Sequence, residues 1–409
     1  MKIGIYGGTF NPIHLGHISL AKQLQCQFSL DRVLLIPTGE PPHKQAEVLA
    51  PATDRIALCR LATAEYPEFS VCDLELQRGG KSYTVDTLRE LRNRFPNDRL
   101  FLILGSDMLF SFTSWKEYRT ILKETVLLAG ARKWREYDAL QEKAKELCAE
   151  GGKVLVSRIS VVPISSTVVR MRMAQGADCR DFLPPSVETY IKEHALYSDR
   201  KQMVREIQAI AAQMLKPERL RHTQCVVKEA LRLAHRFHAD SEQAELAAWL
   251  HDILKNQTKQ SLLQMMDEYG IILSELERRS PALWHAIAAP DYCRCQLGIV
   301  DSQVLTAIRY HTTGRAGMSL LEQILYLADA ISEDRDYPGV ELLRNLAEQS
   351  LESAILTSLT SLLSHLLSQG LLLHPDTVAA YQELTLTHME DDYDRRYVRQ
   401  SSYFAGKTI

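Results

Sequence analysis

Short apolar runs alternate with helical patterns along the first half of the chain. Six runs have the length and composition of buried strands: residues 3–6, 32–37, 69–72, 100–105, 126–129 and 153–156. Between them, residues 18–28, 52–65 and 84–94 place apolar side chains at helical spacing. This alternation predicts an α/β domain, a doubly wound parallel sheet with helices on both faces. Ligands of such sheets bind beyond the carboxyl ends of the strands, and the glycine turn after Tyr6 lies at one such end.

The pattern changes near residue 199, and we find no convincing strand beyond it. Helical spacing of apolar residues continues instead through residues 204–215, 219–237, 241–255, 304–311, 320–332, 342–367 and 377–386. The second half is therefore predicted to be an all-α domain. A short polar stretch at residues 197–201 marks the boundary, so we predict one domain over residues 1–198 and another over 202–409.

Length and composition agree with two globular domains. The 409 residues exceed one ordinary compact domain, and 45% hydrophobic with 24% charged residues is typical of soluble proteins. A net charge of −3 argues against binding nucleic acid or an anionic membrane through bulk charge. No apolar run approaches the ~20 residues of a membrane helix, and the N-terminus lacks the features of a signal peptide.

The eight cysteines are scattered and form no CxxC pair, which argues against a thiolate zinc site. Scattered thiols in a chain without an export signal indicate a reduced, cytoplasmic protein. The sequence leaves open whether the chain forms a homo-oligomer.

The first predicted strand runs into the motif GGTFNPIHLGH, in which His14 and His17 lie three positions apart. At the start of a helix, this spacing places both imidazoles on one face. Glycines let the backbone approach a ligand closely, and a helix N-terminus attracts phosphate. We interpret the histidines as groups that hold phosphates while charge builds up in a transfer reaction. The alternative is that they are ordinary surface or capping residues, and the glycine turn favours the functional interpretation.

A hydroxyl-rich segment precedes another predicted helix. Ser165, Ser166 and Thr167 lie at the start of this helix, and Arg170 follows about one turn later. Hydroxyl residues at such a position are often only helix caps. Together with the histidine motif, they favour a binding site for the phosphates of ATP.

These segments resemble the HxGH-type nucleotidyltransferases, in particular the bacterial nicotinate-nucleotide adenylyltransferases. Further matching segments occur in the expected order: PPHK at 41–44, SYTVDTL at 82–88, GSD at 105–107 and WK at 115–116. The resemblance spans residues 1–198 and implies a Rossmann-like fold. It implies that ATP and nicotinic acid mononucleotide, with Mg²⁺, give nicotinic acid adenine dinucleotide and pyrophosphate. Relatives that act on phosphopantetheine, FMN or glycerol phosphate share the histidine motif, but SYTVDT and residues 115–118 favour nicotinate.

The resemblance also implies roles for individual residues. His14 and His17 would stabilise the transferring phosphates, and Lys44 would neutralise phosphate. Trp115 would stack on the nicotinate ring, which Thr84 would also line. The remaining candidates for binding ATP or nicotinic acid mononucleotide are Thr9, Phe10, Asp107, Arg132, Ser165, Ser166, Thr167 and Arg170. Arg132 would border the adenine, although the segment AGARKW around it departs from the usual Arg-Pro-Gly-like turn.

The second half carries an adjacent pair, His251 and Asp252, near the end of a predicted helix. His222 comes from an earlier helix and Asp329 from a later one. Two imidazoles and two carboxylates suit a divalent transition metal such as Fe or Mn, which would acidify a bound water for attack on a phosphoanhydride. A His–Asp pair also occurs by chance, but here it belongs to an ordered series of histidines and aspartates in an all-α domain.

This series resembles the HD superfamily of metal-dependent phosphohydrolases, most closely the YqeK-like branch, similar to symmetrical bis(5′-nucleosyl)-tetraphosphatases. The segments RLRHT, AAWLHDILK, WHA, RYHTTG, YLADAIS and EDRDYPGV carry the resemblance over residues 202–390. It implies that diadenosine tetraphosphate is hydrolysed to two ADP, with iron as the metal. His222, His251, Asp252 and Asp329 would be the metal ligands. The ADP phosphates, ribose and nucleoside would be bound by Arg219, Lys255, His285, His311, Thr312, Arg335 and Thr377.

Two other functions for the second domain stay open. A nucleotide sensor would bind diadenosine tetraphosphate or a guanine alarmone and tune NAD synthesis without hydrolysis; the complete ligand set argues against it. A hydrolase of the same superfamily would act on a cyclic dinucleotide, a dNTP or guanosine tetraphosphate. The RYHTTG and EDRDYPGV segments argue against these substrates by resemblance.

Overall fold

The computed structural model describes residues 1–41, 49–131, 134–160 and 164–389. The chain divides into two compact units, Met1–Met203 and Val204–Ile409. The division lies within helix α10 (Arg200–Met214), close to the polar stretch at which we predicted a boundary. Each unit has a buried apolar core of its own.

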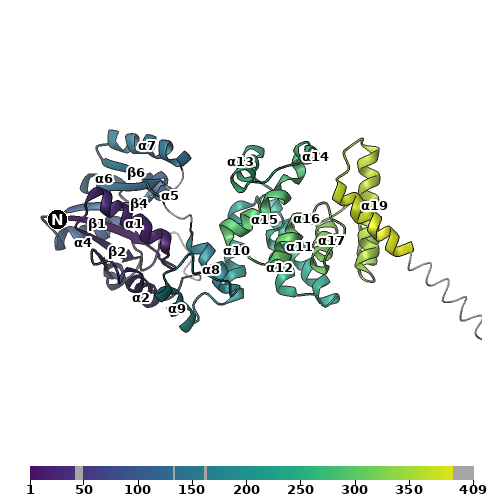
Figure 1. The fold of residues 1–409 in the computed structure, drawn as a ribbon, viewed down its shortest axis with the longest axis horizontal. Helices are drawn as coiled ribbons and strands as arrows, with labels where there is room; N and C mark the ends of the chain where they lie inside the picture. The colour runs from purple at the N-terminus through teal and green to yellow at the C-terminus, as the bar shows by residue number, and fades with distance from the viewer. Residues whose placement is uncertain (42–48, 132–133, 161–163, 390–409) are drawn as a thin grey trace, which may run out of the picture. The chain divides into compact units, whose positions relative to one another are not determined.

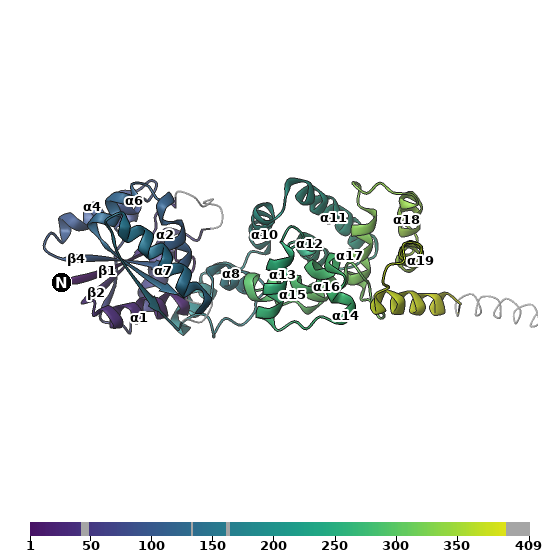
Figure 2. The same cartoon turned by 90° about the horizontal axis from the view of Figure 1, so that it is seen from above.

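The first unit is built on a six-stranded parallel sheet with the order β3-β2-β1-β4-β5-β6 (Figures 1 and 2). The strands are β1 (Lys2–Gly8), β2 (Arg32–Pro37), β3 (Phe69–Val71), β4 (Arg99–Gly105), β5 (Val126–Ala131) and β6 (Lys153–Arg158). All six lie where the apolar runs predicted them, and the predicted α/β class is confirmed. The strand order reverses beside β1, because the chain runs outward to β3 on one side and to β6 on the other. Ligands bind at such a reversal, beyond the carboxyl ends of β1 and β4.

Helices cover both faces of this sheet. They are α1 (Leu15–Phe28), α2 (Ala52–Thr63), α3 (Leu74–Arg78), α4 (Thr84–Arg94), α5 (Ser106–Ser111), η2 (Phe112–Ser114), α6 (Tyr118–Glu124), α7 (Trp134–Ala149), α8 (Ser166–Ala174) and α9 (Pro185–Glu193).

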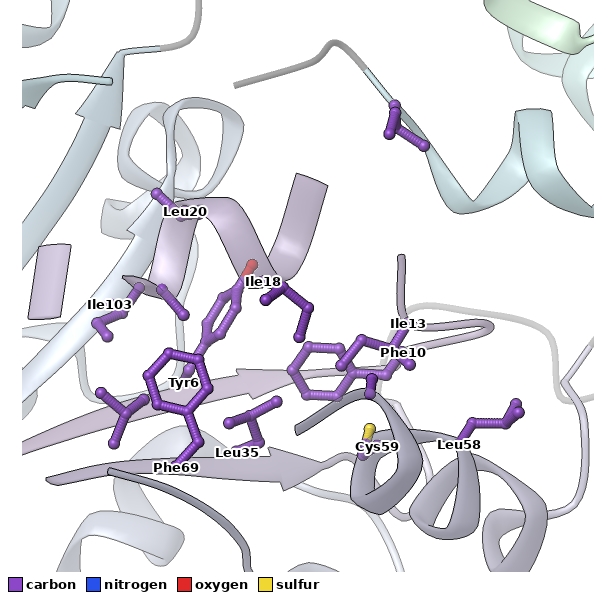
Figure 3. Close-up of a cluster of buried hydrophobic side chains, with 14 of the residues drawn as sticks. Tyr6, Phe10, Ile13, Ile18, Leu20, Leu35, Leu58, Cys59, Phe69 and Ile103 are labelled. Atoms are coloured by element: carbon purple, nitrogen blue, oxygen red, sulfur yellow. The ribbon is translucent and has the colours of Figure 1, made fainter. Parts of the chain in front are cut away.

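Successive strand residues point into two different apolar cores, as the pleat of a strand requires. Tyr6 and Leu35 lie in one core, with residues of α1, α2, α8 and α9. Figure 3 shows this core, with Ile18 and Leu20 of α1 above the strands. Ile5 lies in the other core, with residues of α3, α4, α5, α6 and α7. The two cores fix the sheet between its helical layers, which holds the carboxyl ends of the strands in place.

The second unit is helical, and its described residues form no strand. Its helices are α10, α11 (Pro217–Arg236), α12 (Ser241–Leu250), α13 (Lys259–Tyr269), α14 (Glu275–Arg278), η3 (Pro281–Leu283), α15 (Trp284–Leu297), α16 (Ser302–Tyr310), α17 (Leu320–Ile331), α18 (Val340–Ala347) and α19 (Leu351–Ser368). A further helix covers residues 375–389. The predicted all-α class is confirmed. Within the described ranges, no helix combines the length and hydropathy of a membrane span.

Three helix predictions need correction. α13 and α15 were not predicted; α15 buries six consecutive residues from Trp284 to Ala289, so it has no apolar stripe for periodicity to reveal. The helix predicted over 342–367 is two helices, α18 and α19. The break occurs because the Ser350 hydroxyl accepts from the N–H of Ser353 at 3.2 Å and caps α19. The helix predicted over 241–255 ends at Leu250, so His251 and Asp252 begin a turn.

Gly130 of β5 should be intolerant of a side chain. A Cβ there would overlap Cδ1 of Ile159 and lie 2.7 Å from Cδ1 of Leu20. We expect Gly130→Ala to lower the free energy of unfolding by roughly 1–3 kcal/mol, measured by urea titration of the full chain. Gly7→Ala is the control, because no described atom lies within 4 Å of its added Cβ. Equal stability of the two variants would contradict this packing.

Two candidate active sites

The two histidines of the first motif meet at the N-terminus of α1. His14 is the N-cap residue, with φ −146° and ψ 169°, and His17 lies in the first turn. The backbone N–H of His14 donates to Nδ1 of His17 at 3.3 Å, and the rings stack with centroids 3.7 Å apart. Because Nδ1 of His17 accepts, the proton of the neutral ring lies on Nε2, which makes Nε2 a donor suited to a phosphate oxygen.

Phe10 supports this pair from the core. It adopts φ 43°, is 1% exposed, and packs edge-on against His17 with ring centroids 5.2 Å apart. Its other edge-on partner is Tyr6 at 5.4 Å. The predicted contact of Phe10 with a substrate could therefore come only from its backbone.

The hydroxyl-rich segment lies against the same turn. Ser165 caps α8 by accepting from the N–H of Val168 at 3.2 Å. The Ser166 hydroxyl donates to the carbonyl of Pro12 at 2.9 Å, and Arg170 donates to the carbonyl of Asn11 at 2.5 Å. Arg170 also donates to the Thr167 hydroxyl at 3.1 Å. Two segments more than 140 residues apart thus form one surface, with two helix N-termini beside it.

Arg55 is a site residue that the sequence did not reveal. It is 1% exposed, and its guanidinium donates to the carbonyls of Ala50, Thr9, Thr38 and Gly39 at 2.7–3.2 Å. Burial lowers the pKa of Arg55 from its usual value. These bonds join the turn after β1 to the turn after β2. Arg55 looks like any helical arginine in sequence, so only the fold reveals this role.

A cavity of about 410 Å³ opens at the carboxyl ends of the strands, beside Gly7 and Gly8. Three predicted substrate-binding residues line it together: Thr9, Thr84 and Trp115. Its wall also holds Glu75, whose carboxylate accepts from the Thr87 hydroxyl at 2.6 Å. Glu75 and Thr87 were not predicted. An apolar cavity with an indole and a few polar groups suits a flat aromatic ligand.

The remaining predicted residues of this site are less informative. Asp107 lies exposed in the first turn of α5, directly after β4. Lys44 and Arg132 lie outside the described residues, so their roles stay predictions.

The second site forms where α12 ends. His251 is the C-cap residue and is fully buried. Its Nδ1 lies 2.7 Å from the carbonyl of Ala248, which places the proton on Nδ1. Nε2 is then an electron-pair donor, and it has no hydrogen-bond partner among the described residues. A buried unpartnered imidazole nitrogen fits a metal ligand.

Asp252 lies at the centre of this site and is 2% exposed. One carboxylate oxygen lies 3.0 Å from Nε2 of His285, and the other accepts from Arg219 at 2.9 Å. Nε2 of His311 and Nζ of Lys255 each lie 3.7 Å away. Burial opposes ionisation, but the neighbouring histidines outweigh it and hold the pKa of Asp252 well below its usual range.

The other two predicted metal ligands, His222 and Asp329, contact each other close to Asp252. Nε2 of His222 lies 2.9 Å from Oδ1 of Asp329. Arg335 also donates to Oδ1 of Asp329, and to its backbone carbonyl at 2.8 Å. Burial opposes ionisation here too, but His222, His251 and Arg335 lower the pKa of Asp329. Arg335 was predicted to bind phosphate, and it stands next to the ligand set.

The donor atoms form three overlapping groups in which they lie within 4.8 Å of one another. The groups are His222 with His251 and Asp252, His251 with His311 and Asp329, and Asp252 with His285 and His311. All four predicted ligands thus come together. His285 and His311, predicted to bind phosphate, also belong to these groups. Nδ1 of His311 lies 2.8 Å from the carbonyl of Ile308, as in a metal ligand, and its Nε2 lies 3.7 Å from Asp252. Nε2 of His285 lies 3.1 Å from Nζ of Lys255 as well as 3.0 Å from Asp252.

Two predicted nucleotide-binding threonines lie at the turn that follows α16: Thr312 is part of this turn, and Thr377 contacts it. The Thr312 hydroxyl is buried without a hydrogen-bond partner in the described part of the chain. Thr377 is 3% exposed and donates to the carbonyl of Thr313 at 2.8 Å, so it ties this loop to the last described helix. Both remain candidates for contact with a nucleotide.

Comparison with known proteins agrees with the two sites. Residues 5–172 match the cytidylyltransferase-like family model. A probable nicotinate-nucleotide adenylyltransferase of Neisseria meningitidis serogroup B is 41% identical over 202 residues, covering 48% of this chain and 98% of that protein. The chain belongs to the nicotinate-nucleotide adenylyltransferase family. A probable member from Thermus thermophilus is 42% identical over 197 residues, covering 48% of this chain and 100% of the relative.

The other half of the chain carries an HD domain, whose family model matches residues 219–334. A solved structure from Clostridium acetobutylicum, described as a predicted HD superfamily hydrolase involved in NAD metabolism, is 33% identical. It covers 44% of this chain and 96% of that one, with a TM-score of 0.44. Residues 219–334, which match the HD family model, contain all four predicted metal ligands.

The second unit should lose stability in mild acid when metal is absent. Burial lowers the pKa of His251 to about 4, against about 6.5 when unfolded. Between these values only the unfolded chain binds the proton, so the stabilisation is full above about pH 6.5 and is lost as pH falls towards about 4. We expect a loss of about 3 kcal/mol from this group, measured by urea unfolding with EDTA at stepped pH. A profile for His251→Gln as steep as that of the wild type would contradict the assignment.

Proposed function

We propose that this chain joins two nucleotide enzymes. The first unit would transfer the adenylyl group of ATP to nicotinic acid mononucleotide, as the family to which the chain belongs indicates. The second would hydrolyse diadenosine tetraphosphate to two ADP. The HD domain and its buried His–Asp cluster support a metal-dependent hydrolase, and the choice of substrate rests on the resemblance of the sequence motifs.

The observation that supports the first activity is that α8 is hydrogen-bonded, through Ser166 and Arg170, to the turn directly before the His14–His17 pair. The triphosphate of ATP would lie along this surface, held by the N–H groups of two helix N-termini, by Ser165–Thr167 and by Arg170. The nicotinate ring would enter the 410 Å³ cavity and stack on Trp115.

The chemistry requires an in-line displacement at the α-phosphorus of ATP. A phosphate oxygen of nicotinic acid mononucleotide forms the new bond to this phosphorus, and the bond to the leaving pyrophosphate breaks. Negative charge grows on the pyrophosphate, and the imidazoles of His14 and His17 would donate hydrogen bonds to it. Mg²⁺, when bound with ATP, would offset the charge of the phosphates. No side chain needs to form a covalent intermediate.

His17→Ala should remove one of these donors. We expect the rate of pyrophosphate release from ATP, Mg²⁺ and nicotinic acid mononucleotide to fall roughly 10²–10³-fold. Asp252→Asn is the control, because it changes only the second unit and should leave this rate unchanged. Full activity of His17→Ala, or no pyrophosphate from the wild type, would overturn the assignment. Nicotinamide mononucleotide in a parallel reaction measures the preference for the acid.

The observation that supports the second activity is the buried donor cluster around His251 and Asp252. Within it, Nε2 of His251 has no hydrogen-bond partner among the described residues and lies 3.6 Å from Oδ2 of Asp252. His222, His251, Asp252 and Asp329 would hold a divalent ion, Fe or Mn by the mixture of imidazole and carboxylate donors. Such an ion supplies an acidified water and a Lewis acid when bound.

The cations around the cluster suit a polyphosphate. Arg219 and Lys255 approach Asp252 from one side, and Arg335 borders Asp329. With the ligands committed to an ion, these groups and His285 and His311 would contact phosphate oxygens. Attack by water in the middle of the phosphate chain leaves ADP on either side, which is the symmetrical cleavage we propose.

A direct assay distinguishes the proposed substrate from the alternatives. Purified full chain with Fe²⁺ or Mn²⁺ under anaerobic conditions should convert diadenosine tetraphosphate to two ADP, separated from AMP and ATP by chromatography. We expect EDTA and His251→Ala to abolish ADP formation, while His17→Ala should leave it intact. Binding of diadenosine tetraphosphate without turnover by the metal-loaded protein would instead indicate a nucleotide sensor.

A further inference from the structure

The imidazole of His222 contacts carboxylates through both ring nitrogens. Nε2 lies 2.9 Å from Oδ1 of Asp329, inside the donor cluster. Nδ1, on the other edge of the ring, lies 2.8 Å from Oδ2 of Asp334. His222 is 5% exposed, whereas a quarter of the Asp334 side chain is exposed, so it is the histidine that shields these contacts from water. Asp334 does not belong to any of the three donor groups.

The carboxylate of Asp334 is also fixed by a hydrogen bond on the side away from His222. Its second oxygen, Oδ1, accepts from the Ser332 hydroxyl at 2.7 Å, and Ser332 is fully buried. Arg344 of α18 anchors the turn by donating to the carbonyls of Ile331, Ser332 and Arg335 at 2.7–3.0 Å. The Asp334 carboxylate therefore has little freedom to move away from His222.

The neighbouring acid Glu333 behaves differently. Its carboxylate pairs with Lys228, and both side chains are more than half exposed. It meets the thiol of Cys225 at 3.6 Å but not His222. Of these two neighbouring acids, only Asp334 contacts a predicted metal ligand in the described structure.

We propose that Asp334 is a positioning residue that prepares His222 to bind metal. This inference rests on the proposed metal site of the second unit. Accepting a hydrogen bond from Nδ1–H fixes the neutral tautomer whose lone pair is on Nε2, and fixes the rotation of the ring towards Asp329. The negative charge of Asp334 also makes Nε2 a stronger electron-pair donor. Ser332, in turn, holds Asp334.

The test compares metal binding of the full chain and its variants Asp334→Ala, Asp334→Asn, Ser332→Ala and Glu333→Gln. The probe is Co²⁺ alone, titrated into metal-free protein with a competing chelator. We expect Asp334→Ala to lower Co²⁺ affinity roughly 10–100-fold, the usual effect of removing such a partner, and Glu333→Gln to bind like the wild type. Asp334→Asn keeps an acceptor without the charge, so its loss should be smaller, and Ser332→Ala should lose least.

A second measurement separates positioning from a merely structural role. In protein loaded with diamagnetic Zn²⁺, proton–nitrogen-15 NMR should show the Nδ1 proton of His222 as a downfield resonance that the hydrogen bond to Asp334 protects from exchange. This protection should be lost in Asp334→Ala while the unfolding temperature changes little. If Asp334→Ala does not fold, the same resonance in Asp334→Asn, with weaker protection, carries the test.

Unchanged Co²⁺ affinity and an unchanged Nδ1 proton resonance of His222 in a folded Asp334 variant would overturn the proposal, as would a wild type that binds no Co²⁺. Failure of the hydrolysis assay is a separate result. Wild type that binds Co²⁺ but leaves diadenosine tetraphosphate intact would contradict the proposed substrate and leave the role of Asp334 standing.

Discussion

Charge buried inside a protein must be compensated, and both sites of this chain depend on how that is done. Asp252 is ionised in the core because imidazoles, a guanidinium and an ammonium surround it. The same groups are those that the chemistry would use. Arg55 shows the opposite arrangement, a buried cation solvated by four backbone carbonyls. In that position it fixes the two turns that frame the first site and keeps positive charge beside a surface that suits phosphate.

The fold class of each unit could be predicted from the sequence, because the spacing of apolar residues along a segment is set by whether that segment is a strand or a helix. Strands buried on both faces produce short apolar runs, and all six were found. Amphipathic helices such as α17 produce a stripe of apolar positions. α15 escaped because its first six residues are all buried and Pro290 lies inside it, and the break before Ser350 escaped because one side-chain hydrogen bond decides it.

The sites were readable in part, for a different reason. Histidine and aspartate are conspicuous when they stand in a motif, so His14, His17, His251 and Asp252 could be singled out. Arg55 and Asp334 could not, because their partners lie far away along the chain and the contacts exist only in the fold. Nor does the sequence separate a histidine that binds phosphate from one that binds metal; His285 and His311 have a geometry that suits either.

The two sites also differ in the helix termini that border them: N-termini at the first site and C-termini at the second. At the first, α1 and α8 begin at the site and α5 begins directly after β4, so partial positive charge collects there. At the second, α12 and α16 end at His251 and His311, and Asp329 lies in the last turn of α17; the three helices pack together. Their carbonyl ends give the site a negative potential of its own. The nearest cations, Arg219, Lys255 and Arg335, already lie against carboxylates. In the hydrolase that we propose, the metal ion would supply the positive charge that these helix ends do not, so it would bind before the anionic nucleotide.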